Sequence, residues 1–398
     1  MNNSQRLIRT DLKGGIVRSE VNYKTKSTGE ISGRIVTPHG IIDGTVSFKD
    51  GHIVAVSGNP AADNGLASTG LTLVPGFIDL HNHGGLGGAF PTGTVEQARR
   101  AAQFHRSQGT TILLASLVSA PPEELIKQVK VLKELCEEGL LFGIHLEGPF
   151  INACRCGAQN PDSIYPGNPE DFGQIIGAAA GWIKSITIAP ETPNLVALLE
   201  LCAQHGIIVS FGHTDADFET TTHAISQATA LGLTVTATHL FNAMPPLHHR
   251  APGAAGAMLA AARNGEAFVE LVADGVHLSD GTVDFARSER AFFVSDAIEA
   301  AGMPDGNYIL GVLEVEVQGG VARLKNGGAI AGGTSTIAQQ FRRHVARGMT
   351  LCDATQLSST TASRVLGLRQ HAIEVNAPLN IVALDSQGQV AAVYVKEI

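Results

Sequence analysis

The chain is organised around one stretch, Val74-Pro-Gly-Phe-Ile-Asp-Leu-His81-Asn-His83-Gly-Gly-Leu-Gly-Gly88. A run of apolar residues opened by Pro-Gly predicts a buried strand, and the glycines after it predict a tight turn. His81 and His83 stand at the end of this strand, where side chains two residues apart point to the same side. They can therefore converge on one cation. Two surface-loop histidines would give the same pattern, so the rest of the chain must decide.

Downstream of this stretch, strand-like and helix-like segments alternate. The predicted helices include Val95 to Ser107, Pro122 to Glu138, Asn194 to His205 and Phe218 to Leu231. The predicted strands are Val74 to Leu80, Thr111 to Ser116, Leu140 to Leu146, Ile183 to Ala189, Ile207 to Gly212, Thr234 to Thr238, Phe268 to Ala273 and Ala291 to Ser295. This alternation predicts an α/β fold, a TIM-like (β/α)8 barrel. A doubly wound sheet is the alternative, but no GxGxxG follows the first strand in the required setting.

The two ends of the chain carry a different pattern. Short β-branched segments separated by Gly, Asp-Gly and Pro follow Ile31, and a similar pattern returns from Leu379 to Val395. We therefore predict one small β-sandwich domain from residues 31–73 and 372–398, a hydrolase barrel over residues 74–371, and a polar N-terminal arm over residues 1–30.

Composition limits the class of protein. The 398 residues are 44% hydrophobic and 16% charged, with a net charge of −9, which disfavours nucleic acid as a partner and favours a small molecule. No secretory signal and no apolar run of membrane-spanning length is visible. Five cysteines at irregular spacing form no disulfide framework. We expect a cytoplasmic protein with no membrane partner.

Residues of metal-ligand type close four further strands or follow them directly. If the barrel is right, they meet His81 and His83 at one rim, where catalytic groups of such barrels lie. These residues are Glu147, His213, His239 and Asp296.

Imidazoles with carboxylates and no thiolate suit a divalent cation, zinc first, with iron, manganese or cobalt as alternatives. One or two ions are compatible with this set. Two ions sharing Glu147 is the simplest arrangement, with His81 and His83 on one side and His213 and His239 on the other. Such a site would activate a water, and Asp296 would be the general base that takes its proton and passes it to a leaving amine. Asp296 as a helix N-cap is the alternative.

This constellation resembles the amidohydrolase superfamily. Within it, the strings HLEGPF, FGHT, HLFNAMPPLHHR, ADGVHL and SDAIEAAGMPDGNY resemble those of N-acetylglucosamine-6-phosphate deacetylases. They occur in the same order over residues 74 to about 340, and the flanking β domain extends the resemblance to nearly the whole chain.

The resemblance implies hydrolysis of the acetamido group of an amino-sugar phosphate, giving acetate and the free amine. It implies that Glu147, His213 and His239 bind metal and that Asp296 is the catalytic acid/base. The substrate contacts that it implies are Asn242, the backbone of Ala243, and Arg250 for the phosphate, with His277, Ala158 and Gln159 for the rest of the substrate. Arg suits phosphate because its guanidinium donates in a planar fork. It also implies a homodimer.

The loop after Glu147 departs from the family pattern. Members often have Lys-Gly-Ala-His where this chain has Arg155-Cys156-Gly-Ala158-Gln159, so Gln159 stands where a substrate-contacting His is usual. Competing hypotheses are a deacetylase for the galactosamine epimer, another amidohydrolase such as a nucleobase hydrolase, and a barrel that binds without catalysis. Asp296 argues against the last of these, and the pairing of Asn242 with Arg250 argues for a phosphate.

Overall fold

A computed structural model describes residues 6–10, 16–20, 22–23 and 28–396, with side chains from residue 28 onward. The chain divides into two compact units. One is formed by Met1–Asp79, Gln103–Ile112 and Ser335–Ile398, and the other by Leu80–Ala102 and Leu113–Thr334. Half of the predicted arm over residues 1–30 lies outside the described residues. Within the described part of the chain, every helix is too short or too polar to cross a lipid bilayer.

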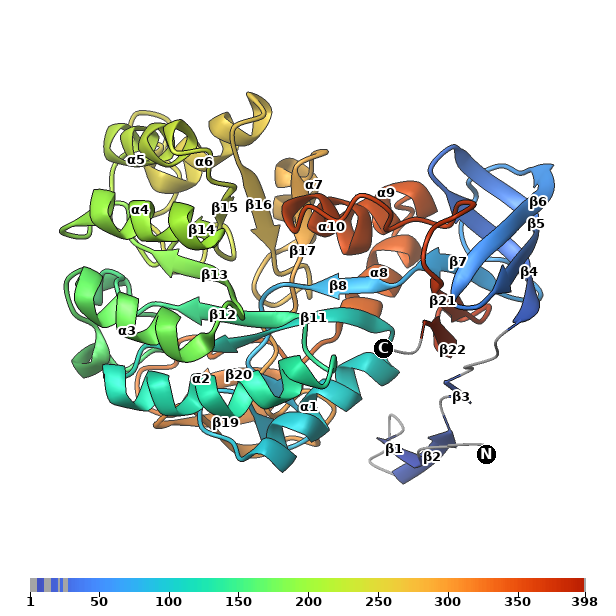
Figure 1. Cartoon of the computed structure of the whole chain (residues 1–398), viewed down its shortest axis with the longest axis horizontal. Helices are drawn as coiled ribbons and strands as arrows, with labels where there is room; N and C mark the ends of the chain where they lie inside the picture. Colours follow the sequence, from blue (N-terminus) through green and yellow to red (C-terminus); the bar gives the residue numbers. More distant parts are fainter. Residues whose placement is uncertain (1–5, 11–15, 21, 24–27, 397–398) are drawn as a thin grey trace. The chain divides into compact units, whose positions relative to one another are not determined.

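Eight strands form one parallel sheet in the order β17-β16-β15-β14-β13-β12-β11-β8 (Figure 1). An isolated parallel bridge joins Asn82 after the first strand to Ala297 after the last, so the two edges of the sheet meet and the barrel nearly closes. The bounds of the strands are β8 Phe77–Asp79, β11 Thr110–Leu117, β12 Gly143–Glu147, β13 Ile183–Ile188, β14 Ile208–Phe211, β15 Val235–Ala237, β16 Phe268–Leu271 and β17 Ala291–Phe293. The predicted barrel is confirmed.

Helices connect the strands and cover the outside of the sheet (Figure 1). Each buries one side: α2 buries Leu125, Val129 and Leu132, which follow one another at helical spacing. Polar N-caps begin several of them, such as Asp217, whose side chain accepts from the backbone N–H of Thr220. Their bounds are α1 Val95–Ser107, α2 Pro122–Glu137, α3 Pro169–Ala179, α4 Leu195–His205, α5 Phe218–Ala230, α6 Gly253–Arg263 and α7 Asp280–Ala286. Two 3-10 turns, Ala153–Arg155 and Pro161–Ser163, lie between α2 and α3.

The segment predicted as the first barrel strand is divided at Gly76. Its first part, β7 (Thr72–Pro75), pairs with a strand from the end of the chain, and its second part is β8. The backbone changes partners at this point, because Gly76 N–H donates to the carbonyl of Asn380 at 3.1 Å whereas Phe77 N–H donates to that of Gly109 at 3.0 Å. One apolar run in the sequence therefore serves two sheets.

Both ends of the chain contribute to one seven-stranded sheet, in the order β3-β22-β21-β7-β4-β5-β6. Ile35, Val46, Leu73 and Ile381 are fully buried in its core, so strands from residues 31–73 share that core with strands from the end of the chain. The bounds are β3 Asn22–Tyr23, β4 Thr28–Thr37, β5 Gly40–Lys49, β6 His52–Pro60, β21 Asn380–Leu384 and β22 Val390–Val395.

A three-stranded antiparallel sheet follows the last barrel strand and was not predicted. Its strands are β18 Gly306–Leu310, β19 Leu313–Gln318 and β20 Val321–Leu324, and its core joins Val315 and Val317 to Ile298 and Val118. Helices α8 (Ile337–Ala346), α9 (Leu351–Thr355), a π-helix (Gln356–Thr360) and α10 (Thr361–Val365) come next. Two short antiparallel pairs, β1 (Arg6–Thr10) with β2 (Ile16–Glu20) and β9 (Gly84–Gly85) with β10 (Gly88–Ala89), complete the described strands.

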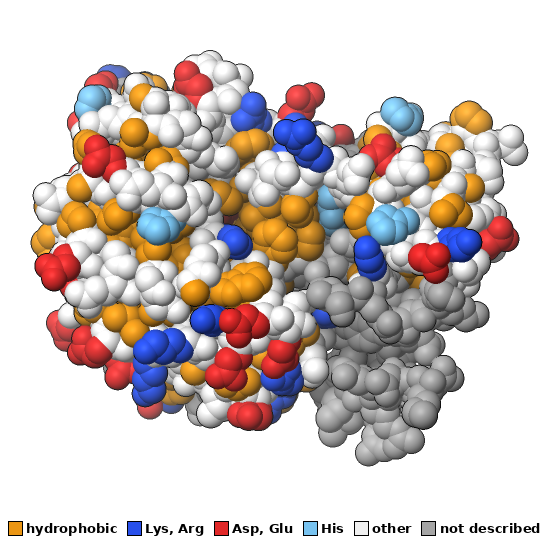
Figure 2. Space-filling view, in the orientation of Figure 1, with side chains coloured by type: hydrophobic (Ala, Val, Ile, Leu, Met, Phe, Trp, Pro, Cys, Tyr) orange, Lys and Arg blue, Asp and Glu red, His pale blue; other side chains and the backbone are white. Residues whose placement is uncertain are grey.

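Acidic and basic side chains are interspersed on the face shown in Figure 2. The described cysteines, which are all five of the chain, are free thiols.

Candidate active site

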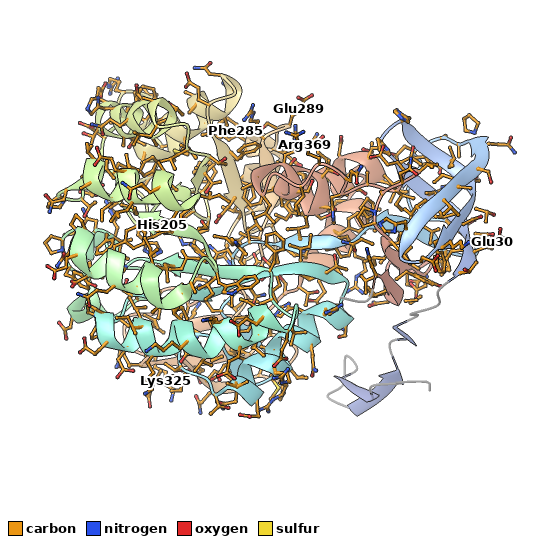
Figure 3. All side chains as sticks on the ribbon, in the orientation of Figure 1. Glu30, His205, Phe285, Glu289, Lys325 and Arg369 are labelled. Atoms are coloured by element: carbon orange, nitrogen blue, oxygen red, sulfur yellow. The ribbon has the colours of Figure 1, made fainter. Side chains whose placement is uncertain are left out.

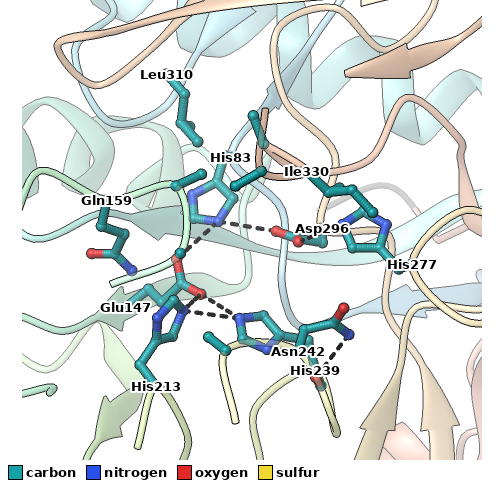
Figure 4. Close-up of a pocket in the computed structure, with 16 residues that line it drawn as sticks. His83, Glu147, Gln159, His213, His239, Asn242, His277, Asp296, Leu310 and Ile330 are labelled. Carbon is teal, nitrogen blue, oxygen red and sulfur yellow. Dashed lines mark hydrogen bonds and ion pairs between the residues drawn. The ribbon is translucent and has the colours of Figure 1, made fainter. Parts of the chain in front are cut away.

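Four imidazoles meet around the carboxylate of Glu147 at the carboxyl ends of the barrel strands, and Figure 4 shows three of them, those of His83, His213 and His239. Its Oε1 lies 3.0 Å from Nε2 of His213 and 2.9 Å from Nε2 of His239. His81 Nε2 lies 3.3 Å from the same oxygen, and His83 Nε2 lies 3.4 Å from Oε2. The structure thus brings together residues that are far apart in the sequence, and one carboxylate touches all four rings.

Asp296 faces this cluster from the end of the last strand. Its Oδ1 lies 3.5 Å from His81 Nε2 and 3.3 Å from His83 Nε2, while Oδ2 lies 3.4 Å from Nε2 of His277. Nδ1 of His277 lies 2.9 Å from a carboxylate oxygen of Asp274. Two groups of buried side chains have donor atoms close enough to share an ion: His81, Glu147 and His239, and His81, His83 and Asp296.

In three of the rings, the outer nitrogen Nδ1 faces away from Glu147, and its contact determines the protonation of the inner nitrogen Nε2, which faces Glu147. Nδ1 of His83 faces the carbonyl of Ser116 at 3.2 Å, and Nδ1 of His213 faces that of Arg155 at 2.8 Å. Nδ1 of His81 faces a carboxylate oxygen of Glu270 at 3.2 Å. A carbonyl or carboxylate oxygen only accepts, so each Nδ1 carries the proton and, in the neutral ring, each Nε2 presents a lone pair.

These inner nitrogens lie unusually close to one another. Nε2 of His81 and Nε2 of His83 are 3.1 Å apart, and so are those of His213 and His239. Lone pairs facing each other and a carboxylate repel unless a proton or a cation lies between them. The donor set and its geometry therefore fit a divalent metal ion, which binds imidazole nitrogen and carboxylate oxygen together.

The electrostatics of the cluster keep its carboxylates ionised. Burial opposes the charge on Glu147, but the neighbouring imidazoles of His81 and His213 outweigh it and hold the pKa of Glu147 well below its usual value. The pKa of Asp296 is also held well below its usual value, because hydrogen bonds from His277 and His83 outweigh burial.

The imidazoles respond in the opposite direction. Burial alone would lower their pKa values, but Glu147 and Asp296 outweigh it, so the pKa of His81 is raised well above its usual value and that of His83 is raised as well. For His277, burial also lowers the pKa, but the hydrogen bonds and negative charges of Asp274 and Asp296 outweigh it and raise the pKa to about 9.

His145 lies beside the cluster and is bonded elsewhere. Its Nδ1 is 2.9 Å from the hydroxyl of Ser116 and its Nε2 is 2.9 Å from that of Thr187. Its ring lies edge to face against the ring of His81, with 4.6 Å between the two ring centroids. Burial, and then the His81 imidazole, hold its pKa well below the usual value. His145 is therefore a neutral residue that packs against His81.

Three of the converging residues have a left-handed backbone. The φ angles are +48° at His213, +26° at His239 and +48° at Asp296. Side chains larger than glycine rarely adopt this region, and such strain gathers at functional sites. The strained residues follow the ends of β14, β15 and β17, where the backbone turns out of the sheet.

A cavity of about 260 Å³ opens above the cluster. Gln159 lines it and is only 4% exposed, and its Oε1 accepts from the backbone N–H of Ser119 at 2.8 Å. This bond turns the amide nitrogen toward Glu147 (Figure 4), and among the described residues that nitrogen has no hydrogen-bond partner. Ala158, Asn242, Ala243 and His277 also line the cavity.

Arg250, unlike the other predicted site residues, lies neither in the lining of the cavity nor in the cluster around Glu147. Its side chain is exposed and is absent from the lining, and its backbone N–H donates to Nδ1 of His248 at 3.3 Å. The rings of His248 and His249 contact each other at a tilt of 41° in the same exposed loop. The chain is exposed from Pro246 to Ala251, in the connection between β15 and α6.

Three other histidines lie on helices α1, α4 and α8. His105 and His344 are fully buried, and His205 is exposed at the end of α4 (Figure 3).

Comparison with known proteins decides the family. The family model for amidohydrolases matches residues 72–397. The chain belongs to the amidohydrolase family.

Several relatives of this amidohydrolase are deacetylases of N-acetylated amino-sugar phosphates. An N-acetylglucosamine-6-phosphate deacetylase of Bacillus subtilis is 33% identical over 89% of this chain and 92% of its own length. An N-acetylgalactosamine-6-phosphate deacetylase of Escherichia coli O157:H7 is 29% identical over 91% of this chain and 96% of its own. A solved structure of a mutant of the N-acetyl-D-glucosamine-6-phosphate deacetylase of Mycobacterium smegmatis, in complex with N-acetyl-D-glucosamine-6-phosphate, superposes with a TM-score of 0.85 at 35% identity, covering 94% of this chain and 99% of that one.

Sequence reasoning missed one residue that this amidohydrolase builds into the site. Glu270 is 3% exposed, and its Oε2 accepts both from His81 Nδ1 and from the backbone N–H of His239 at 3.0 Å. A charged residue inside the apolar strand Phe268–Leu271 was the available signal, because a buried carboxylate needs partners.

Proposed function

We propose that this amidohydrolase hydrolyses the acetamido group of N-acetyl-D-glucosamine 6-phosphate, releasing acetate and D-glucosamine 6-phosphate. The names of its relatives support the substrate. The observation that carries the chemistry is the convergence of four imidazoles on Glu147 with Asp296 beside them, because an amide is stable unless its carbonyl is polarised and a water is activated.

The proposed ligands of the metal site are His81, His83, Glu147, His213 and His239. One or two ions are compatible with the contacts of Glu147, whose two oxygens face different histidines; zinc is the first expectation. A divalent ion bound here lowers the pKa of a water and polarises a carbonyl. The protein holds the ligand rings in place through the bonds to their outer nitrogens.

Asp296 is the proposed catalytic residue. Its carboxylate is ionised, borders the cavity, and can accept the proton of the attacking water. It then returns this proton to the amine that leaves, which must be protonated to depart. His277 holds Oδ2 of Asp296 by a hydrogen bond, so Oδ1 remains turned toward the metal ligands.

The remaining lining residues are proposed to bind the substrate. The side chain of Asn242 and the backbone of Ala243 would bind the phosphate end, and Arg250 would need to move to join them. On the other side of Glu147, the amide nitrogen of Gln159, beside Ala158, would donate to an oxygen of the substrate. Because an amide does not titrate, this donor keeps its hydrogen at every working pH.

Acetate release tests the substrate. We expect kcat/KM for N-acetylglucosamine 6-phosphate to exceed that for N-acetylglucosamine by at least about a hundredfold, because the loss of a bound phosphate leaves polar groups unpaired. N-acetylgalactosamine 6-phosphate is the matched competitor that differs at one hydroxyl. Equal kcat/KM values with and without the phosphate would contradict the proposed substrate. A higher kcat/KM for N-acetylgalactosamine 6-phosphate would identify that epimer as the substrate instead.

Three further expectations remain proposals. Family resemblance supports a homodimer, which light scattering of the purified protein would test. The free thiols agree with a cytoplasmic location. The predicted boundaries, with an arm over residues 1–30, a β domain of residues 31–73 and 372–398 and a barrel of residues 74–371, can be tested by limited proteolysis, which should cut near residue 30.

A further inference from the structure

A second, larger cavity adjoins the catalytic one. Its volume is about 660 Å³, and it lies among the starts of α1 and α2, residues 158–163, and the turn between β18 and β19. Its lining is largely apolar and includes Val95, Leu117, Val118, Leu125 and Leu313. The charged residues Glu96, Glu124 and Lys127 have exposed side chains at its rim. The chamber therefore offers an apolar interior with a charged mouth.

Three residues line both cavities and so form the wall between them: Ala158, Gln159 and Leu310. Leu310 is the bulkiest apolar member and is only 6% exposed. It belongs to the apolar cluster that contains Val118 and contacts Ala158, and its strand pairs it with Leu313 across the turn. These contacts hold its side chain in the wall.

An amide substrate extends in two directions from its carbonyl carbon, the amine part on one side and the acyl part on the other. The cleaved carbonyl must lie beside Glu147 and Asp296. Under the proposed function, the sugar phosphate extends toward Asn242, and Figure 4 shows Leu310 and Gln159 on the opposite side of the Glu147 carboxylate. The acyl group therefore faces the wall.

We propose that Leu310, with Ala158 and Gln159, restricts the substrate to a short N-acyl group, and that the chamber behind this wall receives longer N-acyl chains when the wall is lowered. This inference rests on the proposed function. An acetyl group fits in front of the wall, whereas an alkyl chain of several carbons needs an apolar space beyond it. Binding in such a space becomes more favourable with every methylene that leaves water. Leu310 is thus a specificity-determining residue.

The test compares N-acetyl-, N-butanoyl- and N-hexanoylglucosamine 6-phosphate as substrates of the wild type and of Leu310→Ala. The ratio of kcat/KM for butanoyl over acetyl should rise about tenfold or more, the effect of a few methylenes in an apolar pocket. Leu310→Val should shift the ratio in the same direction by less, and it serves if the alanine variant does not fold. Val312→Ala is the matched control, because Val312 lines only the chamber and is 72% exposed; its ratio should not change.

A second substitution shows where the longer chain goes. Ser163 lines the chamber and is absent from the lining of the catalytic cavity, so adding Ser163→Trp to Leu310→Ala should narrow the chamber and reduce the gain. A gain that this narrowing leaves undiminished would overturn the inference. So would an unchanged ratio in a Leu310 variant that still releases acetate, and this result would leave the proposed function standing. Absence of acetate release by the metal-loaded wild type would instead reject the function itself.

Discussion

Asp296 divides its carboxylate between two neighbours, with one oxygen facing His83 and the other facing His277. Asp296→Asn keeps the shape but removes the group that accepts a proton. We expect kcat to fall by about a hundredfold to ten-thousandfold, while sugar-phosphate binding persists. Acetate release and calorimetric titration with the substrate measure the two effects.

The control for this variant is Asp284→Asn on α7, where the side chain is exposed; its activity should equal that of the wild type. If Asp296→Asn retained more than about a tenth of the wild-type kcat, the assignment of the base would be wrong.

Glu270 lies outside the cavity lining but holds two of the proposed ligands. Glu270→Gln replaces an ionised acceptor with a neutral amide and weakens the bond that fixes the His81 ring. We expect metal affinity to fall about tenfold to a hundredfold, as for other groups that orient metal-binding histidines. Metal retained after dialysis against a weak chelator provides the measurement.

Glu266→Gln is the matched control, because this exposed residue lies four positions earlier, just before the same strand. Equal metal retention in both variants would contradict the role given to Glu270.

At the scale of elements, His371 joins two segments of its unit by a neutral ring. Its Nε2 lies 2.8 Å from the carbonyl of Gly76 and 2.9 Å from the hydroxyl of Ser359 in the π-helix. Burial, only partly opposed by the bond to Gly76, lowers the pKa of His371. Since the unfolded chain binds a proton at a higher pH than the folded one, this residue reduces stability as the pH falls below about 6.5.

His371→Gln should therefore flatten the acid side of the stability curve. Its free energy of unfolding should depend on pH less than that of the wild type, by up to about 1.4 kcal/mol per pH unit below pH 6.5, although it is less stable at neutral pH through lost packing. Urea unfolding at several pH values measures this slope. His205→Gln, at an exposed position of α4, should keep the wild-type slope, and an unchanged slope in His371→Gln would contradict the argument.

Most elements could be predicted from the sequence because their signals are local. The periodic segment Val95–Ser107 is a helix with the predicted bounds, and the strand Ile183–Ile188 ends one residue early. The division of the first strand at Gly76 could not be predicted, since it depends on hydrogen bonds to Asn380 and Gly109 that lie far away in the sequence. The sheet from Gly306 to Leu324 was not predicted, because it comes after the last barrel strand and is not part of the alternation of strands and helices that predicts the barrel.

The site could be predicted to a similar extent. Residues that directly follow barrel strands, such as His213 and Asp296, were found because the rim of a barrel collects strand ends. Arg250 shows the limit, because it was placed by resemblance alone and lies on a long loop whose course no local pattern determines. Glu270 shows another, because its role depends on the two groups that it bonds across the barrel.

At the scale of the whole molecule, removal of the metal should reveal the repulsion within the site. The metal-free protein relies on protonated His81 and His83 beside Glu147 and Asp296. Because the pKa values of both histidines are raised in the folded state, this stabilisation is complete below about pH 6.5 and is lost as the pH rises through the raised values. Metal binding has the opposite dependence, since it requires deprotonated imidazoles.

We therefore expect the difference in Tm between metal-loaded and chelated protein to widen from about pH 6 to about pH 8. At a metal concentration a thousand times the Kd, the ion should add about 4 kcal/mol to the stability. Calorimetric scans before chelation, after it and after addition of zinc measure the effect and its reversal. A difference that narrows with rising pH, or chelated and loaded proteins with the same Tm, would contradict a metal site in this cluster.

The left-handed backbone at His213 and Asp296 has a consequence for descent. Glycine would relieve about 1 kcal/mol of strain at each position. In a gene copy that is no longer selected for activity, substitution of these two residues by glycine would therefore increase the stability of the fold. In such a lineage, the substitutions that abolish activity would be favoured by stability. Retention of both residues would therefore indicate a copy still under purifying selection.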